Sequence, residues 1–344
     1  MTDTIRRVDL RSDTVTQPTQ TMRQAMFEAP VGDDFLGEDP TVNRLQALAA
    51  ERLGFEAALW VASGVMGNEI AIRVSTQPGD EVLVERRSHI VEHELAGMAQ
   101  ISGVSACTVE GLAGRIRPED VEAHARPRAY YRSDLTLAVL ENTHNLAGGT
   151  VYTPEQHRAV VAACRHAGLK VHVDGARIWH ASVALGVSPR ELLAGVDTAS
   201  VALSKGLCAP AGSLLLGRAA TIDAARRVRK MLGGGMRQVG ILAAAGIVAL
   251  DEMIPRLAED HAKAQRIGEC LRSLPGVDPS PVRTNIVVAR LHAATAPAIV
   301  TRLSERGVLA SAMDHETLRF VTHRDVSASD CAHAANVIEE TLSD

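Results

Sequence analysis

The chain has 344 residues, of which 46% are hydrophobic and 22% are charged, a composition typical of a globular protein with an ordered core. Its net charge of −5 and its lack of a basic tract argue against a nucleic-acid partner and against attachment to a membrane surface. No segment approaches the about 18 apolar residues of a membrane span, and no secretory signal is recognisable, so the five scattered cysteines are expected as free thiols of a cytoplasmic protein.

Short apolar segments alternate with helical patterns through the first two thirds of the chain. Apolar runs predict strands at 58–64, 81–86, 135–142, 169–177, 199–206 and 212–217, and helical spacing predicts a helix over 154–168 with Gly168 as its C-cap. Near-continuous apolar strands separated by helices are typical of a mainly parallel sheet with both faces covered. The sequence therefore predicts an α/β fold.

The pattern changes after about residue 219. A basic amphipathic stretch, AARRVRKML, is followed by GGGMRQ and by a long apolar helix, VGILAAAGIVALDEMI, and the last hundred residues alternate helices with the weaker strands NIVVARL and LRFVTH. We therefore expect an N-terminal arm over 1–14, a large domain over 15–245 and a smaller α+β domain over 246–344.

Polar residues follow three of the predicted strands. They form the groups Glu141 and Asn142, 174–177, and Ser204 and Lys205. Ligands of open α/β sheets bind outside the carboxyl ends of the strands. We therefore expect these groups, which are distant in sequence, to surround one site.

Lys205 and Asp174 are the leading candidates for chemistry. A buried ammonium is costly unless its charge is suppressed or used, and a lysine of lowered pKa forms a Schiff base with a carbonyl. Enzymes that use pyridoxal phosphate (PLP) pair such a lysine with an acid on the pyridine nitrogen. The structural alternatives are a lysine that extends into solvent and an aspartate that caps the turn before Gly175.

The segment ASGVMGNE (62–69) joins a predicted strand to a helix through Ser-Gly. The free N–H groups of such a helix start bind phosphate, although a simple capping turn has the same pattern. The sequence has neither the dinucleotide-binding motif GxGxxG nor the phosphate-binding motif GxxxxGK[ST] of nucleoside triphosphatases.

Together with VDLRSDT, VGDDFLGEDPTVNRLQ and SHIVEHE, the motifs SGVMGNE, LENTHN, HVDGAR, SKGL and GGGMRQ occur in an order that resembles the low-specificity L-threonine aldolases over nearly the whole chain. The resemblance implies the fold of fold-type I PLP enzymes and a cofactor joined to Lys205. Asp174 would pair with the pyridine nitrogen, and His89 would stack on the ring and handle protons. The further cofactor contacts that it implies are Gly64, Val65, Met66, Arg177, Ser204, Lys230 and Arg237, the last with a neighbouring subunit as an alternative.

The resemblance also implies a substrate site. Ser12, Arg177 and Arg319 would bind the substrate carboxylate, for which the fork of an arginine is suited. The chain departs from the family pattern at Val65, where Thr is usual, and at Leu36, where Tyr is common. His93 replaces an aromatic residue, and Tyr131 (or Tyr130) replaces a histidine. One hypothesis is that His93 now helps to bind the β-hydroxyl while Tyr131 supplies an aromatic ring and a phenol to the pocket. The alternative is that both residues only line the wall and that His89 acts alone.

The implied reaction is the cleavage of L-threonine, L-allo-threonine and related β-hydroxy-α-amino acids to glycine and an aldehyde. His89, directly or through water, is the first candidate for the base that takes the hydroxyl proton, and His93 is the second. The same scaffold supports β-elimination, racemisation and transamination, and these remain alternatives. The resemblance also implies a homotetramer with active sites at dimer interfaces, a small amino-acid substrate and no metal.

SHIVEHE contains the pattern H-x-x-E-H of one class of zinc peptidases, with His89, Glu92 and His93. Residues four apart share a helix face, so two imidazoles could bind one metal ion. This alternative leaves Lys205 and Asp174 without a role, and no further acidic ligand is evident in the sequence.

Overall fold

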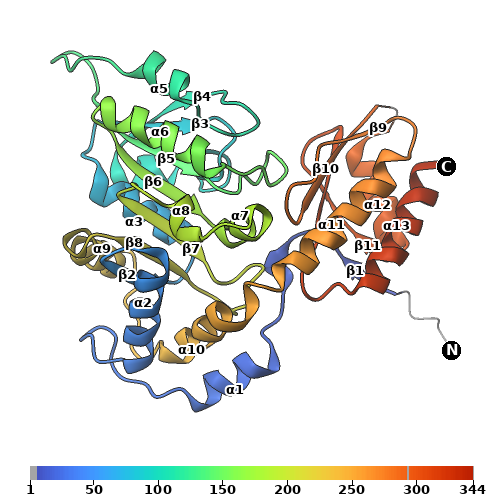
Figure 1. Cartoon of the computed structure of the whole chain (residues 1–344), viewed down its shortest axis with the longest axis horizontal. Helices are drawn as coiled ribbons and strands as arrows, with labels where there is room; N and C mark the ends of the chain where they lie inside the picture. The colour runs from blue at the N-terminus through green and yellow to red at the C-terminus, as the bar shows by residue number, and fades with distance from the viewer. Residues whose placement is uncertain (1–5, 293, 344) are drawn as a thin grey trace.

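Seven strands of the large domain form one sheet in the order β2-β8-β7-β6-β5-β3-β4 in the computed structural model, which describes residues 6–292 and 294–343 (Figure 1). The strands are β2 (Ala57–Val61), β3 (Glu81–Glu85), β4 (Ser105–Val109), β5 (Leu135–Glu141), β6 (Lys170–Gly175), β7 (Thr198–Ala202) and β8 (Ser213–Gly217). The pairs between β4, β3, β5, β6 and β7 are parallel, and β8 is antiparallel to both of its neighbours. The predicted α/β fold with a mainly parallel sheet is confirmed, and β4 is a strand that the sequence patterns did not predict.

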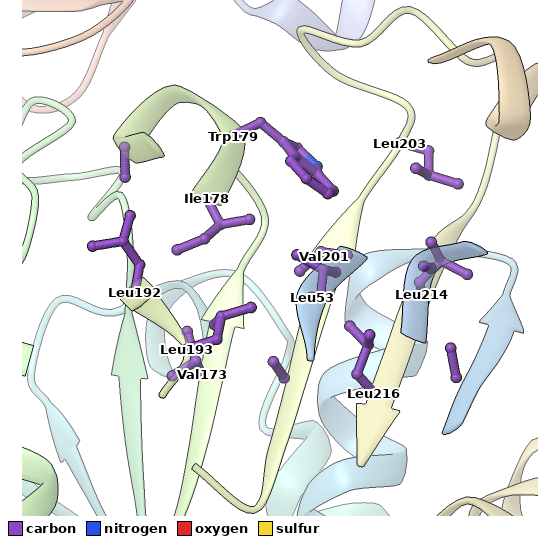
Figure 2. Packing of buried hydrophobic residues seen from close by; sticks show 14 of the residues in the cluster. Leu53, Val173, Ile178, Trp179, Leu192, Leu193, Val201, Leu203, Leu214 and Leu216 are labelled. Carbon is purple, nitrogen blue, oxygen red and sulfur yellow. The ribbon is translucent and has the colours of Figure 1, made fainter. Parts of the chain in front are cut away.

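Successive side chains of these strands enter different hydrophobic cores, as the pleat of a strand requires. On β3, Leu83 belongs to the largest core, whereas Val82 and Val84 belong to a second core with Ile72. Figure 2 shows part of the largest core, in which Val173, Val201 and other strand residues pack beside Ile178 and Trp179. Both faces of the sheet are therefore covered, which explains the near-continuous apolar runs of the strands.

The helices of the large domain lie mostly between its strands in sequence. They are α1 (Gln20–Glu28), α2 (Pro40–Leu53), α3 (Gly64–Ser75), α4 (His89–Glu92), α5 (Pro118–His124), α6 (Pro154–His166), α7 (Ile178–Leu185), α8 (Pro189–Leu192), α9 (Ala219–Met231) and α10 (Gly240–Val248). The short 3-10 helix η1 (Asp13–Val15) and the short π-helices η2 (Met98–Ser102) and η3 (Ala249–Met253) accompany them. The predicted helix at 154–168 is α6, which starts at a capping box between Thr153 and Gln156. Gly168 follows its end with φ of 75°.

The smaller domain contains a four-stranded antiparallel sheet in the order β12-β13-β10-β9. Its strands are β9 (Val277–Pro279), β10 (Ile286–Leu291), β12 (Ser311–Ala312) and β13 (Thr317–Val321), and its helices are α11 (Leu257–Arg272), α12 (Ala296–Glu305) and α13 (Ala328–Ser343). In the N-terminal arm, β1 (Val8–Asp9) pairs in parallel with β11 (Val308–Leu309), so the arm is part of the smaller domain before it crosses to the large one.

The division between the two hydrophobic cores lies later than the expected boundary at residue 245. Ile247, Met253 and Leu257 belong to the core of the large domain, and Ala264 is the first residue of α11 in the core of the smaller domain. The reason is that α10 packs on α1 and α2, so its apolar surface is used by the large domain. Helix α11 then leads from one domain to the other (Figure 1). No helix within the described part of the chain is long and apolar enough to cross a membrane.

Candidate active site

Four neighbouring strands bring the predicted site residues to one edge of the large sheet. Lys205 follows β7, Asp174 lies near the end of β6, Glu141 ends β5, and His89 starts α4 shortly after β3. Because these strands are parallel, their carboxyl ends meet at the same edge. The structure therefore brings together groups that are distant in sequence, as expected.

Lys205 lies in a turn whose carbonyl is fixed from two sides. Its backbone oxygen accepts hydrogen bonds from Thr16 Oγ1 at 3.0 Å and from the backbone N–H of Cys208 at 2.9 Å. Burial lowers the pKa of the Lys205 amine, and the positive charge of Arg177 lowers it further, against the opposing effect of Asp174. A lowered pKa increases the fraction of neutral amine, which is the form that attacks a carbonyl carbon.

Asp174 is 4% exposed, and its carboxylate is held by neighbouring donors. Its Oδ1 accepts the N–H of Ala176 at 3.0 Å, and its Oδ2 accepts Asn68 Nδ2 at 2.9 Å. His172 Nε2 lies 3.1 Å from Asn68 Oδ1, and burial lowers the pKa of His172 to about 4, so its neutral ring donates to that oxygen. These bonds orient a carboxylate that fits a protonated ring nitrogen.

His89 is held at its backbone and at its ring. Its N–H donates to Glu141 Oε2 at 2.8 Å, and its Nδ1 lies 2.7 Å from Glu94 Oε1. Burial lowers the pKa of His89, but the hydrogen bond with Glu94 and the charge of Asp174 outweigh it, so the pKa is raised above its ordinary value. With Nδ1 donating to Glu94, Nε2 is the ring nitrogen available to a ligand.

The N-terminus of α3 has the features of a phosphate site. Ser63 caps the helix by accepting the N–H of Met66 at 3.2 Å, while the N–H groups of Gly64 and Val65 belong to the first turn, where an α-helix leaves them without a partner. Ser213 Oγ is buried beside Gly64 without a partner among the described residues, and a Cβ on Gly64 would lie 3.7 Å from it. An unpaired hydroxyl at a helix start fits a bound phosphate.

Two arginines share one acceptor on the substrate side of the site. Asn145 Oδ1 accepts Arg177 Nη1 at 3.2 Å and Arg319 Nη1 at 3.1 Å. Arg177 also binds buried Asp13 through two bonds of 2.8 and 2.7 Å. Arg319 Nε is buried without a partner in the described structure, and burial beside Arg177 lowers the pKa of Arg319 to about 10. An unpaired guanidinium donor of this kind fits a carboxylate ligand.

Ser12, Ser204 and Met66 lie close to these groups. Ser12 caps η1 by accepting the N–H of Thr14 at 3.2 Å and directly precedes Asp13, and Ser204 directly precedes Lys205. Met66 contacts the GGG segment, because a Cβ on Gly234 would collide with its sulfur.

Lys230 and Arg237 are exposed instead. Lys230 Nζ lies 4.4 Å from the ring centre of Phe35, and Arg237 lies 3.7 Å from Asp33. No contact among the described residues joins either side chain to Lys205. Their predicted roles toward the cofactor therefore stay predictions.

His93 and Tyr131 are far apart within one chain. His93 packs edge-on against His89 with ring centres 5.4 Å apart, and it lines a hollow of about 550 Å³ with Arg319. Tyr131 is 68% exposed and precedes the start of β5, whereas the site lies at the other end of this strand, about 20 Å away at ~3.3 Å per residue. Within a single chain, Tyr131 therefore does not share with His93 the pocket in which both were expected.

The H-x-x-E-H motif does not form a metal site in the structure. Glu92 is exposed on the short helix α4, and its carboxylate does not join the two histidines in a cluster of ligand atoms. The acidic groups that do lie near His89 are Glu94 and Asp174, and Asn68 bridges them by hydrogen bonds. This cluster is a hydrogen-bonded network that orients side chains.

Sequence reasoning gave no role to four residues that organise this site. They are Asp13, Asn68, Glu94 and Asn145, and each binds a predicted residue: Arg177, Asp174, His89 or Arg319. All four lie inside the motifs RSDT, SGVMGNE, SHIVEHE and LENTHN. These motifs could therefore have indicated that the four residues belong to the site. Which residue each of them binds depends on contacts between segments that are distant in sequence.

Comparisons with known proteins agree with this site. The model of the beta-eliminating lyase family matches residues 9–294. The chain is 40% identical to low-specificity L-threonine aldolase 1 of Arabidopsis thaliana over 98% of this chain and 97% of that protein. It is 41% identical to the low specificity L-threonine aldolase of Escherichia coli strain K12 over 95% and 97% of the two chains.

A solved structure supports the fold. The threonine aldolase of Leishmania major superposes with a TM-score of 0.83 at 19% sequence identity, over 97% of this chain and 99% of that one. The family model covers most of the chain, and the two relatives cover nearly all of it at about 40% identity. The chain therefore belongs to the beta-eliminating lyase family and is a relative of the low-specificity L-threonine aldolases.

Proposed function

We propose that this protein is a PLP-dependent lyase that cleaves L-threonine and L-allo-threonine to glycine and acetaldehyde. The observation that carries the proposal is the convergence of Lys205, Asp174 and His89 at the carboxyl ends of the parallel strands β7, β6 and β3, which lie on one edge of the sheet with β5 between β6 and β3. The relatives named above are L-threonine aldolases at about 40% identity, which supports the same substrate class.

The donors of the site fit the three reactive parts of PLP. Lys205 would hold its aldehyde carbon, Asp174 its ring nitrogen, and the N-terminus of α3 its phosphate, with the unpaired hydroxyl of Ser213 close by. When it is bound, PLP supplies a protonated pyridine ring that accepts the electrons of a bond broken at Cα. Asp174 would keep that nitrogen protonated, because a buried carboxylate favours a nearby positive charge.

Arg319 and Arg177 would bind the carboxylate of the amino acid. Arg177 is already neutralised by Asp13, so Arg319, with its buried unpaired Nε, has the greater share of this task. A carboxylate fixed at this end of the site would orient the bonds of Cα relative to the cofactor. That orientation would decide between Cα–Cβ cleavage, β-elimination and transamination, which start from the same bound state.

His89 is the group that fits removal of the β-hydroxyl proton. Its Nδ1 is engaged by Glu94, so Nε2 can accept the proton directly or through one water molecule. We propose that His93, whose ring packs against His89 and whose pKa is lowered by burial and by His89, contacts the hydroxyl. The aldehyde leaves after the Cα–Cβ bond breaks, and transfer of a proton to Cα then gives glycine.

The chain's own surface supports assembly into a homotetramer, which we propose with active sites at the interfaces. Phe27, Phe35 and Leu36 are large apolar side chains with 86%, 54% and 63% exposure. The Phe35 ring contacts the exposed Lys230, and the exposed Arg237 lies near Asp33 of the same loop. An interface over these residues would bury apolar area and direct the two cations toward a neighbouring site. Light scattering coupled to size-exclusion chromatography tests this assembly, and a monomer that is fully active would contradict it.

The proposed reaction is tested by product analysis on the purified protein with added PLP. L-threonine, L-allo-threonine and L-phenylserine should each give glycine and one equivalent of the matching aldehyde. Release of a 2-oxo acid and ammonia from threonine would show β-elimination instead. Glycine formation in this way would give the protein a role in threonine breakdown and glycine supply, in keeping with a cytoplasmic enzyme.

A further inference from the structure

Glu69 is a buried acid that the proposed reaction does not use. It lies on α3 directly after Asn68, its side chain is 2% exposed, and neither carboxyl oxygen has a hydrogen-bond partner among the residues that the structure describes. A carboxylate that is buried without donors costs free energy, whereas a protonated carboxyl group can donate a hydrogen bond. Burial without donors therefore favours the protonated form of Glu69, which needs an acceptor for its O–H group.

A second acid with an unpaired oxygen lies beside it. Glu94 uses Oε1 to accept Asn68 Nδ2 at 2.9 Å and to contact His89 Nδ1, but its Oε2 is buried without a partner in the described chain. The turn that follows Glu94 is closed by the N–H of Gly97, which donates to Glu94 O at 2.8 Å. A Cβ on Gly97 would collide with the Glu69 carboxyl group, so Glu69 packs against the turn that carries Glu94.

We propose that Glu69 carries a proton below neutral pH and donates it in a hydrogen bond to Glu94 Oε2, and thereby positions the carboxylate that holds His89. This inference deepens the proposed function, since it rests on His89 as the residue that handles the proton of the β-hydroxyl. Glu69 is a positioning residue in this arrangement, because it acts through Glu94 and does not itself touch the substrate.

The electrostatics of the pair agree with one shared proton. Burial raises the pKa of Glu69 to about 7, and the charge of Glu94 adds to the effect. Burial also raises the pKa of Glu94, whereas its bonds from His89 and Asn68 favour its charged form. Two neighbouring carboxyl groups in a buried site ionise in two separate steps, and the one without donors keeps its proton to the higher pH. One proton on Glu69 gives a hydrogen-bond partner both to the Glu69 carboxyl group and to Glu94 Oε2.

The other charged and titratable groups around the pair are directed elsewhere. Beyond Glu94, the pair faces His89 from α4 and Asp174 from β6. Of the groups on elements that pack against α3, Arg229 of α9 binds Asp34 and His172 of β6 binds Asn68. No Lys, Arg or His side chain of the described residues forms a hydrogen bond with the Glu69 carboxyl group.

The consequence is a pH-dependent control of His89. While Glu69 is protonated, Glu94 holds a single negative charge that accepts the Nδ1 proton of His89 and leaves Nε2 free. When Glu69 ionises, a second negative charge favours the protonated ring of His89, which cannot accept a proton. The holoenzyme should therefore show a titration near pH 7 that belongs to Glu69.

Infrared spectroscopy of the holoenzyme tests the proton directly, because the carbonyl stretch of a protonated carboxyl group is separate from that of a carboxylate. We expect the wild-type protein to show this band at pH 6, to lose it above pH 8, and to lack it at both values in Glu69→Gln. Glu122→Gln, which removes an exposed carboxylate on α5, serves as control and should keep the band. A band that persists in Glu69→Gln at pH 6 would overturn the proposal.

The pH dependence of kcat and KM separates positioning from a merely structural role. Glu69→Gln keeps a donor for Glu94 but cannot ionise, so its kcat profile should lack the step near pH 7. Glu69→Leu removes the donor and should lower kcat about tenfold with little change in KM, as expected for a lost hydrogen bond to a charged group. Profiles of wild type and Glu69→Gln that coincide would refute the control of His89. If threonine is not cleaved at all, the proposed function fails while the infrared test of Glu69 still stands.

Discussion

The side-chain amide of Asn68 donates a hydrogen bond of 2.9 Å to Asp174 Oδ2. The same nitrogen donates to Glu94 Oε1, also at 2.9 Å, and its carbonyl oxygen receives the proton of His172 Nε2. One amide therefore connects the acid expected at the cofactor nitrogen with the acid behind His89. It also separates two carboxylates that would otherwise repel one another in a buried site.

Asn68→Asp tests this bridge. A third carboxylate in place of the amide removes the donor from Asp174 and Glu94, so Asp174 should bind the ring nitrogen less well. We expect the affinity for PLP to fall about tenfold, the value of one hydrogen bond to a charged group. Absorbance titration of the cofactor-free protein with PLP measures it, and an unchanged Kd would show that Asn68 does not orient Asp174.

Lys205→Ala should abolish covalent attachment of PLP and turnover. Mass spectrometry of the wild-type protein after borohydride reduction should place the adduct on the peptide that contains Lys205. Lys170→Ala is the matched control, because Lys170 Nζ donates to the backbone oxygen of Ser75 and starts β6 at the other edge of the sheet. An adduct on Lys170 or Lys230 would refute the assignment.

Arg319→Ala and Arg177→Ala should have different effects. Arg319 has a buried unpaired Nε, so its loss should raise KM by roughly tenfold to a hundredfold while PLP occupancy holds. Arg177 neutralises Asp13, which is fully buried, so its loss should lower the free energy of unfolding by about 3–5 kcal/mol. Kinetics and denaturant unfolding of both variants distinguish the roles, and loss of PLP from Arg319→Ala would assign that residue to the cofactor instead.

The pH dependence of stability should reveal His172. Burial lowers the pKa of this histidine to about 4, below the value of 6.5 expected in the unfolded chain. As the pH falls from 6.5 to 4, His172 becomes protonated in the unfolded chain but stays neutral in the folded protein. The free energy of unfolding therefore decreases over this pH range. A shift of this size corresponds to about 3 kcal/mol.

His172→Gln removes this titration. The unfolding free energy of the variant should fall less steeply between pH 6.5 and pH 4 than that of the wild type, as measured by urea unfolding at each pH. Equal slopes for the two proteins would show that the His172 ring is protonated in the folded state.

His93→Phe tests recognition of the β-hydroxyl. His93 lies beside His89 and shares a hollow with Arg319, so its loss should lower turnover and shift the ratio of L-threonine to L-allo-threonine cleavage. The spectrum of bound PLP should not change. Wild-type rates on both epimers would leave His93 without a role in recognition. Recovery of activity by Tyr131→His in this variant would show that a neighbouring subunit delivers residue 131, since the two positions are far apart in one chain.

The strands of the large domain show which parts of the fold local sequence patterns can predict. The apolar runs at 81–86, 135–142 and 169–177 are β3, β5 and β6, because strands buried on both faces need continuous apolar sequence. The antiparallel direction of β8 and the strand β4 were not predicted. Strand direction depends on the path of the connecting chain, and β4 is partly exposed, so its sequence, SACTV, lacks a continuous apolar run.

The sequence by itself determined the fold class and the residues at the strand ends, because apolar periodicity and breaks at polar residues are local properties of the chain. Lys205 and Asp174 could be chosen for that reason, whereas His89 was chosen from the resemblance to the threonine aldolases. Only the tertiary structure decided their partners, such as Asn68 for Asp174 and Asp13 for Arg177. It also separated Tyr131 from His93 and buried Glu69 beside Glu94. Burial and the hydrogen bonds between distant segments set these relationships, and both arise only when the chain packs.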